Sequence, residues 1–170
     1  MKKILFVCTG NIFRSMSAEY IMKKHIEDKN IKDFEVASAG IRAQPQEPHI
    51  ETLRTLYSLG IEKIDHKQQK LTDDIIEKYD IIIAMGKDHK SFIKKEFGYV
   101  VPLFNEVAIG KKTAVLDVHE KIPDWTRQKE KANKHFHDTL IHIDESMPAL
   151  ITRLRKFDAE LRWGKKPVDI

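Results

Sequence analysis

Apolar residues follow two spacings that alternate along the chain. Short apolar or alternating runs predict strands, at residues 4–7, 34–37, 80–85 and 99–103. Between these runs, apolar residues recur every three or four positions, as Ala18, Ile21 and Met22 do, and this spacing indicates one face of a helix. The helices expected from this pattern and from Pro and Gly at their ends cover residues 15–29, 48–60, 72–78 and 87–97, with a long final helix that contains residues 136–154 and bends at Pro148.

Strands that alternate with helices predict a doubly wound α/β fold, with a mainly four-stranded parallel sheet flanked by helices on both faces. Residues 80–85 are apolar on both faces, so this strand is expected at the centre of the sheet. Residues 38–40 are expected to form a turn, and residues 105–125 a long irregular stretch of the kind that often carries function. A ligand is expected beyond the carboxyl ends of the strands.

A length of 170 residues predicts a single domain, 1–170, with a C-terminal extension from about residue 155. The net charge of +4 comes from lysines scattered over the chain, so nucleic acid is not an expected partner. No apolar run is long enough to cross a bilayer, and neither a membrane nor an export signal is expected. The single cysteine cannot form an internal disulfide, which suits a cytoplasmic location.

The most informative stretch joins the first strand to the first helix and contains Cys8 and Arg14. A tight loop at a helix N-terminus directs backbone N–H groups inward, and that geometry suits a tetrahedral dianion such as phosphate. A thiol at this position beside an arginine ionises more readily than a free cysteine. The guanidinium offers two parallel donors to two oxygens of the anion. The sequence therefore predicts a nucleophilic Cys8 and a phosphate-binding Arg14.

The other residues of this loop have side chains that fit the same reading. Gly10 and Asn11 tolerate a positive φ, and Ser15 is placed to cap the helix and to donate to the thiolate. The expected phosphate-binding residues are Thr9, Gly10, Asn11, Ile12, Phe13, Arg14 and Ser15. The competing interpretation is a structural cysteine buried at a strand end.

A thiolate that attacks a phosphate ester needs an acid to protonate the leaving oxygen. Asp124 is the first choice, because Pro123 stiffens the backbone before it and Trp125 can pack beside an aromatic leaving group. Asp117, on the same long stretch, is the second choice. The alternative role for Asp124 is a helix cap.

The segments 8–15, 18–19, 38–40 and 123–124 together resemble the low-molecular-weight protein-tyrosine phosphatases, and the resemblance reaches to about Leu154. It implies a nucleophilic Cys8, a phosphate-binding Arg14 and a general acid, Asp124. It also implies polar support of the loop by Asn11, Ser15, Ser38 and His66. The expected substrate is a phosphotyrosyl protein or a small aryl phosphate, and inorganic phosphate is the product. No cofactor and no metal are expected.

The chain departs from the family pattern at several positions. Phe13 replaces a second loop cysteine, Met16 a proline, and Gly86 an aspartate common after the central strand. Trp125 and Thr126 stand where Pro and Tyr are expected, and residues 41–48 lack an aromatic residue that often walls the cleft. The effects of these changes on activity are not predicted.

Three alternatives stay open from the sequence. Some relatives dephosphorylate arginine, but these have a small threonine where this chain has Ile12, whose bulk favours a flat aryl ester. Arsenate reduction by a cysteine relay requires further cysteines, which this chain lacks. A phosphate- or phosphopeptide-binding module with weak catalysis is the third alternative. The histidines at 119, 135, 137 and 142 lack the spacing of a metal site.

Overall fold

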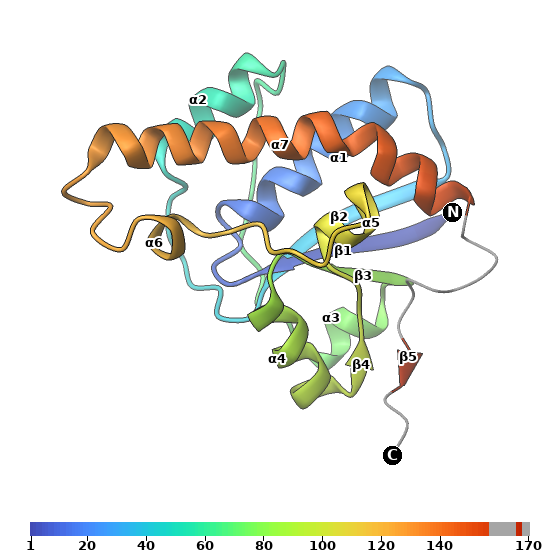
Figure 1. The fold of residues 1–170 in the computed structure, drawn as a ribbon. Helices are drawn as coiled ribbons and strands as arrows, with labels where there is room; N and C mark the ends of the chain where they lie inside the picture. Colours follow the sequence, from blue (N-terminus) through green and yellow to red (C-terminus); the bar gives the residue numbers. More distant parts are fainter. Residues whose placement is uncertain (157–165, 168–170) are drawn as a thin grey trace.

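The computed structural model describes residues 1–156 and 166–167, and its centre is a parallel sheet in the order β2-β1-β3 (Figure 1). The strands are β1 (Lys2–Cys8), β2 (Phe34–Gly40) and β3 (Ile81–Ala84). One face carries α1 (Arg14–Asp28), α2 (Ile50–Ser58) and α7 (Lys129–Lys156), and the other carries α3 (Asp73–Glu77) and α4 (Lys87–Phe97). The predicted doubly wound α/β fold is confirmed.

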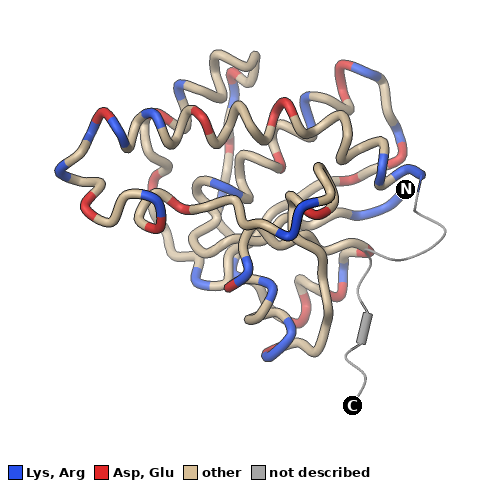
Figure 2. The backbone as a smooth tube through the Cα atoms, in the orientation of Figure 1, with Lys and Arg blue, Asp and Glu red and all other residues tan. Residues whose placement is uncertain are grey.

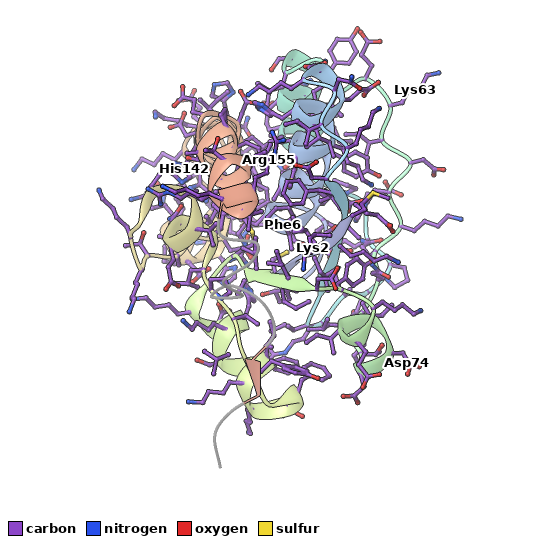
Figure 3. The ribbon with its side chains drawn as sticks, turned by 90° about the vertical axis from the view of Figure 1, so that its right-hand side faces the viewer. Lys2, Phe6, Lys63, Asp74, His142 and Arg155 are labelled. Carbon is purple, nitrogen blue, oxygen red and sulfur yellow. The ribbon has the colours of Figure 1, made fainter. Side chains whose placement is uncertain are left out.

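The buried side chains of β1 explain why this strand is central. Ile4 and Phe6 join the apolar cluster beneath α1 and α7, whereas Leu5 and Val7 join the cluster on the α4 side. Successive residues of a strand point to opposite faces, so an apolar run is required where both faces are covered. Figure 3 shows Phe6 in the interior and Lys63 and Asp74 at the periphery. Cys8 shares the face of Ile4 and Phe6.

The edge of the sheet differs from the prediction in detail. Tyr99–Val100 (β4) pairs antiparallel with Lys166–Pro167 (β5), and only Leu103 makes a parallel bridge to Ala84 at the end of β3. Beside β3, where a fourth parallel strand was expected, the structure thus has a single bridge. Pro102 explains part of this difference, because proline has no N–H to donate to a strand ladder.

Two other expectations change with the structure. Residues 38–40 continue β2 and do not form a turn, because they pair in register with residues 6–8 of β1. The stretch expected to be irregular contains two short helices, α5 (Phe104–Ile109) and α6 (Val118–Lys121). The expected long final helix is present as α7 and contains Pro148. The extension expected from about residue 155 lies largely outside the described residues.

The carboxyl ends of the strands meet at one edge of the sheet. Cys8 pairs with Gly40, and Val7 pairs with Ala84, so the segments that follow the three strands begin side by side. Figure 2 shows that acidic and basic residues are interspersed along most of the elements around them. Within the described residues, no helix combines the length and the apolar character that a bilayer span requires.

Gly40 fixes how closely β2 approaches the loop after β1. A Cβ atom at this position would lie 2.5 Å from the carbonyl oxygen of Thr9 and 3.0 Å from the backbone nitrogen of Asn11. Both are backbone atoms, so neither can move aside as a flexible side chain would. Only glycine allows the strand end and the loop to be this close.

We predict that Gly40→Ala destabilises the protein by about 1–3 kcal/mol, because the added methyl group forces two backbone segments apart. Denaturant unfolding measures this change. Gly10→Ala is the matched control, since a Cβ there would lie 3.5 Å from Ile12 Cγ1, an ordinary contact. Equal stability of the two variants would contradict the steric account.

Candidate active site

A cavity of about 440 Å³ opens at the carboxyl end of the sheet, and the loop between β1 and α1 forms its base. Residues Cys8 to Arg14 all line this cavity. The loop is too short to turn with ordinary backbone angles alone, and Asn11 has a φ of 59°. Asn11 therefore takes the left-handed conformation expected for one of the two candidate residues.

Cys8 lies at the end of β1 and is only 2% exposed. Its Sγ is 2.9 Å from the hydroxyl oxygen of Ser15, in the first turn of α1. Phe13 is the N-cap residue of this helix, and no side chain caps it. The expected capping role of Ser15 is therefore wrong, whereas its expected contact with the sulfur is present.

The side chain of Asn11 holds the loop in shape through several hydrogen bonds. Its Nδ2 donates to the hydroxyl oxygens of Ser15 (3.0 Å) and Ser38 (2.8 Å), and its Oδ1 accepts from the backbone N–H of Gln69 (3.1 Å). The carbonyl oxygen of Asn11 accepts from Nε2 of His66 at 2.7 Å. A buried amide that satisfies both ends in this way is rigid, because every alternative orientation leaves a polar atom unpaired.

A further layer of polar contacts surrounds Asn11. Ser38 donates to the buried carboxylate of Glu19, and Glu19 also pairs with Lys23. Gln69 donates from its side chain to the carbonyl oxygen of Ser38 at 2.8 Å. The structure thus brings both predicted support residues, Ser38 and His66, to the loop. Gln69 and the role of Glu19 were not predicted.

Arg14 is 2% exposed, and its guanidinium lies in the cavity wall. Nη1 donates to the carbonyl oxygen of Val115 (3.1 Å) and to Oε1 of Glu120 (3.3 Å). Nη2 lies 3.5 Å from Oδ2 of Asp117 and donates to Thr9 Oγ1 at 3.5 Å. These contacts fix the plane of the guanidinium beside the sulfur-bearing loop.

His89, on α4, is fully buried and contacts the loop at Thr9. Its Nε2 shares a hydrogen bond of 2.8 Å with the hydroxyl of Thr9. Burial, and next the charge of Arg14, lower the pKa of His89 to about 4. Asp88 and Asp117 act in the opposite direction but with smaller effect. The imidazole is therefore neutral at neutral pH, and sequence analysis did not identify it.

Three aromatic rings form one wall of the cavity. The ring of His49 stacks on Phe136, with centroids 4.2 Å apart, and Trp125 meets both rings edge-on at 6.1 Å. Burial lowers the pKa of His49, which favours the uncharged imidazole. Trp125 lines the cavity as predicted, whereas His49 and Phe136 were missed. His49 lies one residue after segment 41–48, where the family pattern often has an aromatic residue.

The two candidate acids occupy different places. Asp117 lines the cavity and faces Arg14, whereas Asp124 is exposed and lines a separate hollow with Lys121 and Lys131. The side chain of Asp124 accepts a hydrogen bond from Gln128. Asp124 therefore does not line the cavity that contains Cys8, although the next residue, Trp125, does.

The histidines at 119, 135, 137 and 142 do not gather into a cluster. His119 pairs with Asp117, His135 contacts Phe13, and His142 shares a hydrogen bond with Asn105. Within residues 1–156 and 166–167, no group of three or more potential metal ligands comes together. The residues that line the cavity include the thiol of Cys8, the guanidinium of Arg14 and the carboxylate of Asp117.

We predict that the folded protein loses stability as the pH falls from about 6.5 to about 4, partly through His89. In this range the unfolded chain binds a proton on the imidazole and the folded chain does not. His89→Gln keeps a polar partner for Thr9 but does not titrate. The decrease in the free energy of unfolding over this pH range should be smaller in this variant by on the order of 3 kcal/mol. Denaturant unfolding at several pH values measures the difference, and parallel curves for both proteins would contradict the assignment.

Comparison with known proteins places this geometry in a family. The sequence profile described as "Low molecular weight phosphotyrosine protein phosphatase" matches residues 3–160. A protein of that name from Dictyostelium discoideum is 27% identical over 174 residues, covering 88% of this chain and 95% of the relative. A protein-arginine-phosphatase from Bacillus subtilis is 36% identical over 98 residues, covering 56% of this chain and 63% of the relative.

A solved structure agrees with these matches. The YwlE arginine phosphatase, in a cysteine-to-serine variant with a phosphorylated active-site serine, superposes with a TM-score of 0.78 and 28% identity. The superposition covers 94% of this chain and 99% of that one. Since the profile spans almost all of the described residues, the chain belongs to the low molecular weight phosphotyrosine protein phosphatase family.

Proposed function

We propose that this protein hydrolyses phosphotyrosine in proteins, and other aryl phosphate monoesters, through a phosphocysteine intermediate on Cys8. The observation that carries the proposal is the cavity itself. The thiol of Cys8 and the guanidinium of Arg14 line it, and one wall holds the stacked rings of His49 and Phe136. A flat aryl group fits beside such a wall, while the phosphoryl group reaches the loop.

In the first step, the thiolate of Cys8 attacks phosphorus and a sulfur–phosphorus bond forms. The bond between phosphorus and the phenolic oxygen breaks, and Asp117 gives its proton to that oxygen. Arg14 and the loop amides stabilise the charge on the equatorial oxygens. Ser15 donates to the sulfur and steadies it as an anion.

In the second step, water attacks the phosphocysteine and the carboxylate of Asp117 accepts its proton. The sulfur–phosphorus bond breaks, the thiolate returns, and inorganic phosphate leaves. We assign the acid to Asp117 because this residue, unlike Asp124, lines the cavity that contains Cys8. We also propose a cytoplasmic location, because a reducing compartment keeps a nucleophilic thiol free.

Phosphoarginine is the second candidate substrate. One relative is an arginine phosphatase, and Glu47 at the cavity rim offers a carboxylate to a guanidinium. Ile12 and the aromatic wall favour an aryl ester over a long, charged side chain. A phosphate-binding module without catalysis is a third candidate.

We predict that a phosphotyrosyl peptide is hydrolysed with a kcat/KM about tenfold above that of the matching phosphoarginyl peptide, a factor of the size that one aromatic contact supplies. Phosphate release from both peptides is measured side by side. Faster hydrolysis of the phosphoarginyl peptide would assign the protein to the other substrate.

Cys8→Ser is the control for that assay. It should lower kcat by at least about a thousandfold and still bind inorganic phosphate, because Arg14 and the loop are unchanged. If the intact protein binds phosphate but hydrolyses neither peptide nor any aryl phosphate, the binding-module interpretation holds instead.

We predict that Asp117→Asn lowers kcat for phenyl phosphate by roughly 10²- to 10⁴-fold, and that for p-nitrophenyl phosphate by much less. Phenol is a poor leaving group and needs a proton, whereas p-nitrophenol leaves readily without one. Asp124→Asn is the matched control and should behave like the wild type with both esters. The reverse pattern would restore Asp124 as the acid.

A further inference from the structure

The short helix α6 carries Asp117 at its N-terminus but is only four residues long, Val118–Lys121. A helix of this length is not stable by itself, because nucleating one turn costs more than its few hydrogen bonds return. The position of Asp117 therefore depends on contacts that hold this turn to the rest of the protein.

Glu120 supplies two of these contacts with a single oxygen. Its Oε1 accepts the backbone N–H of Asp117 at 2.9 Å, which completes a capping box with the Asp117 side chain. The same oxygen lies 3.3 Å from Nη1 of Arg14 and accepts its hydrogen bond. One carboxylate thus joins the acid-bearing turn to the guanidinium.

The chain before this turn is tied to the same place. The N–H of Val115 donates to the carbonyl oxygen of Met85 at 2.8 Å, just after β3. The carbonyl oxygen of Val115 accepts from Nη1 of Arg14 at 3.1 Å. Arg14 therefore contacts residues 115, 117 and 120, and its guanidinium joins α6 to the segment that precedes it.

Position 86, just after β3, supplies no carboxylate to Arg14 because it is a glycine. A Cβ there would lie 2.7 Å from Oδ1 of Asp88, an exposed side chain that can turn aside, and 3.2 Å from Nδ1 of the buried His89. Among the residues that the structure describes, the acidic partners recorded for Arg14 are Asp117 and Glu120, both at α6.

We infer that Glu120 is a positioning residue, which holds the acid Asp117 in register with the phosphate-binding Arg14. This inference rests on the proposed function, in which Asp117 protonates the leaving group. The side chain of Glu120 is partly exposed and does not line the cavity. It acts on the reaction through the backbone N–H of Asp117 and the guanidinium of Arg14.

We predict that Glu120→Ala lowers kcat for phenyl phosphate roughly five- to tenfold, by loosening the capped turn that holds the acid. The kcat for p-nitrophenyl phosphate and the competitive inhibition constant of inorganic phosphate should change less than about threefold, because neither depends on the acid. Glu120→Gln keeps an acceptor oxygen and should restore most of the phenyl phosphate rate. Lys121→Ala, on the exposed end of the same turn, should match the wild type.

Amide hydrogen exchange at Asp117 provides a readout that is independent of turnover. Glu120→Ala should speed this exchange at least about fivefold, and Lys121→Ala should not change it. Equal loss of rate with both esters, a gain of rate, or unchanged exchange at Asp117 would each overturn the inference. A wild-type protein that hydrolyses no ester would instead refute the proposed function, and the exchange measurement would still test the contact.

Discussion

The arrangement of the site depends on one amide side chain, that of Asn11. A loop of five residues, 9–13, must turn the chain from β1 into α1 and still leave its inner face open to an anion. Asn11 makes this possible by adopting a positive φ and by binding two serines, one backbone N–H and, through its carbonyl, His66. Because these partners come from several segments, the loop is rigid only when the sheet and its connections are in place.

Arg14 makes the site depend on residues 115–120 as well. Its guanidinium accepts no hydrogen bonds and donates several, so its partners must be hydrogen-bond acceptors. The carbonyl of Val115 and the carboxylates of Asp117 and Glu120 meet this requirement, more than 100 residues away in the sequence. The neutral, buried His89 can lie close to Arg14 because it adds no second positive charge. Charge balance and loop geometry therefore support each other.

Sequence reasoning identifies the features of the site that depend on local chemistry. Cys8, Asn11 and Arg14 lie within seven residues, and the apolar strand before them fixes the face of the sheet on which Cys8 lies. The placement of the acid was harder, since it depends on a short helix within a stretch that has no apolar periodicity. A local signal did exist, because Asp117 and Glu120 have the spacing of a capping box.

The aromatic wall of the cavity and the buried histidine beside the loop could not be predicted from the sequence. His49 and Phe136 meet only because α2 and α7 pack together, and neither is near Cys8 in the sequence. His89 lies on a helix whose apolar face is short, so its burial against Thr9 is a result of tertiary packing. Likewise, Val100 pairs with Lys166, a residue far away in the sequence, and this pairing could not be predicted from the local pattern.

The contribution of α7 to the cavity has a consequence for synthesis of the protein on the ribosome. The thiol loop is made first, within the first 15 residues, whereas Phe136 belongs to the last long helix. Until α7 leaves the exit tunnel, the nascent chain has a nucleophile but neither a complete aromatic wall nor the packing that seats it. Packing of α7 against α2 is therefore a late event that completes the aromatic wall of the cavity.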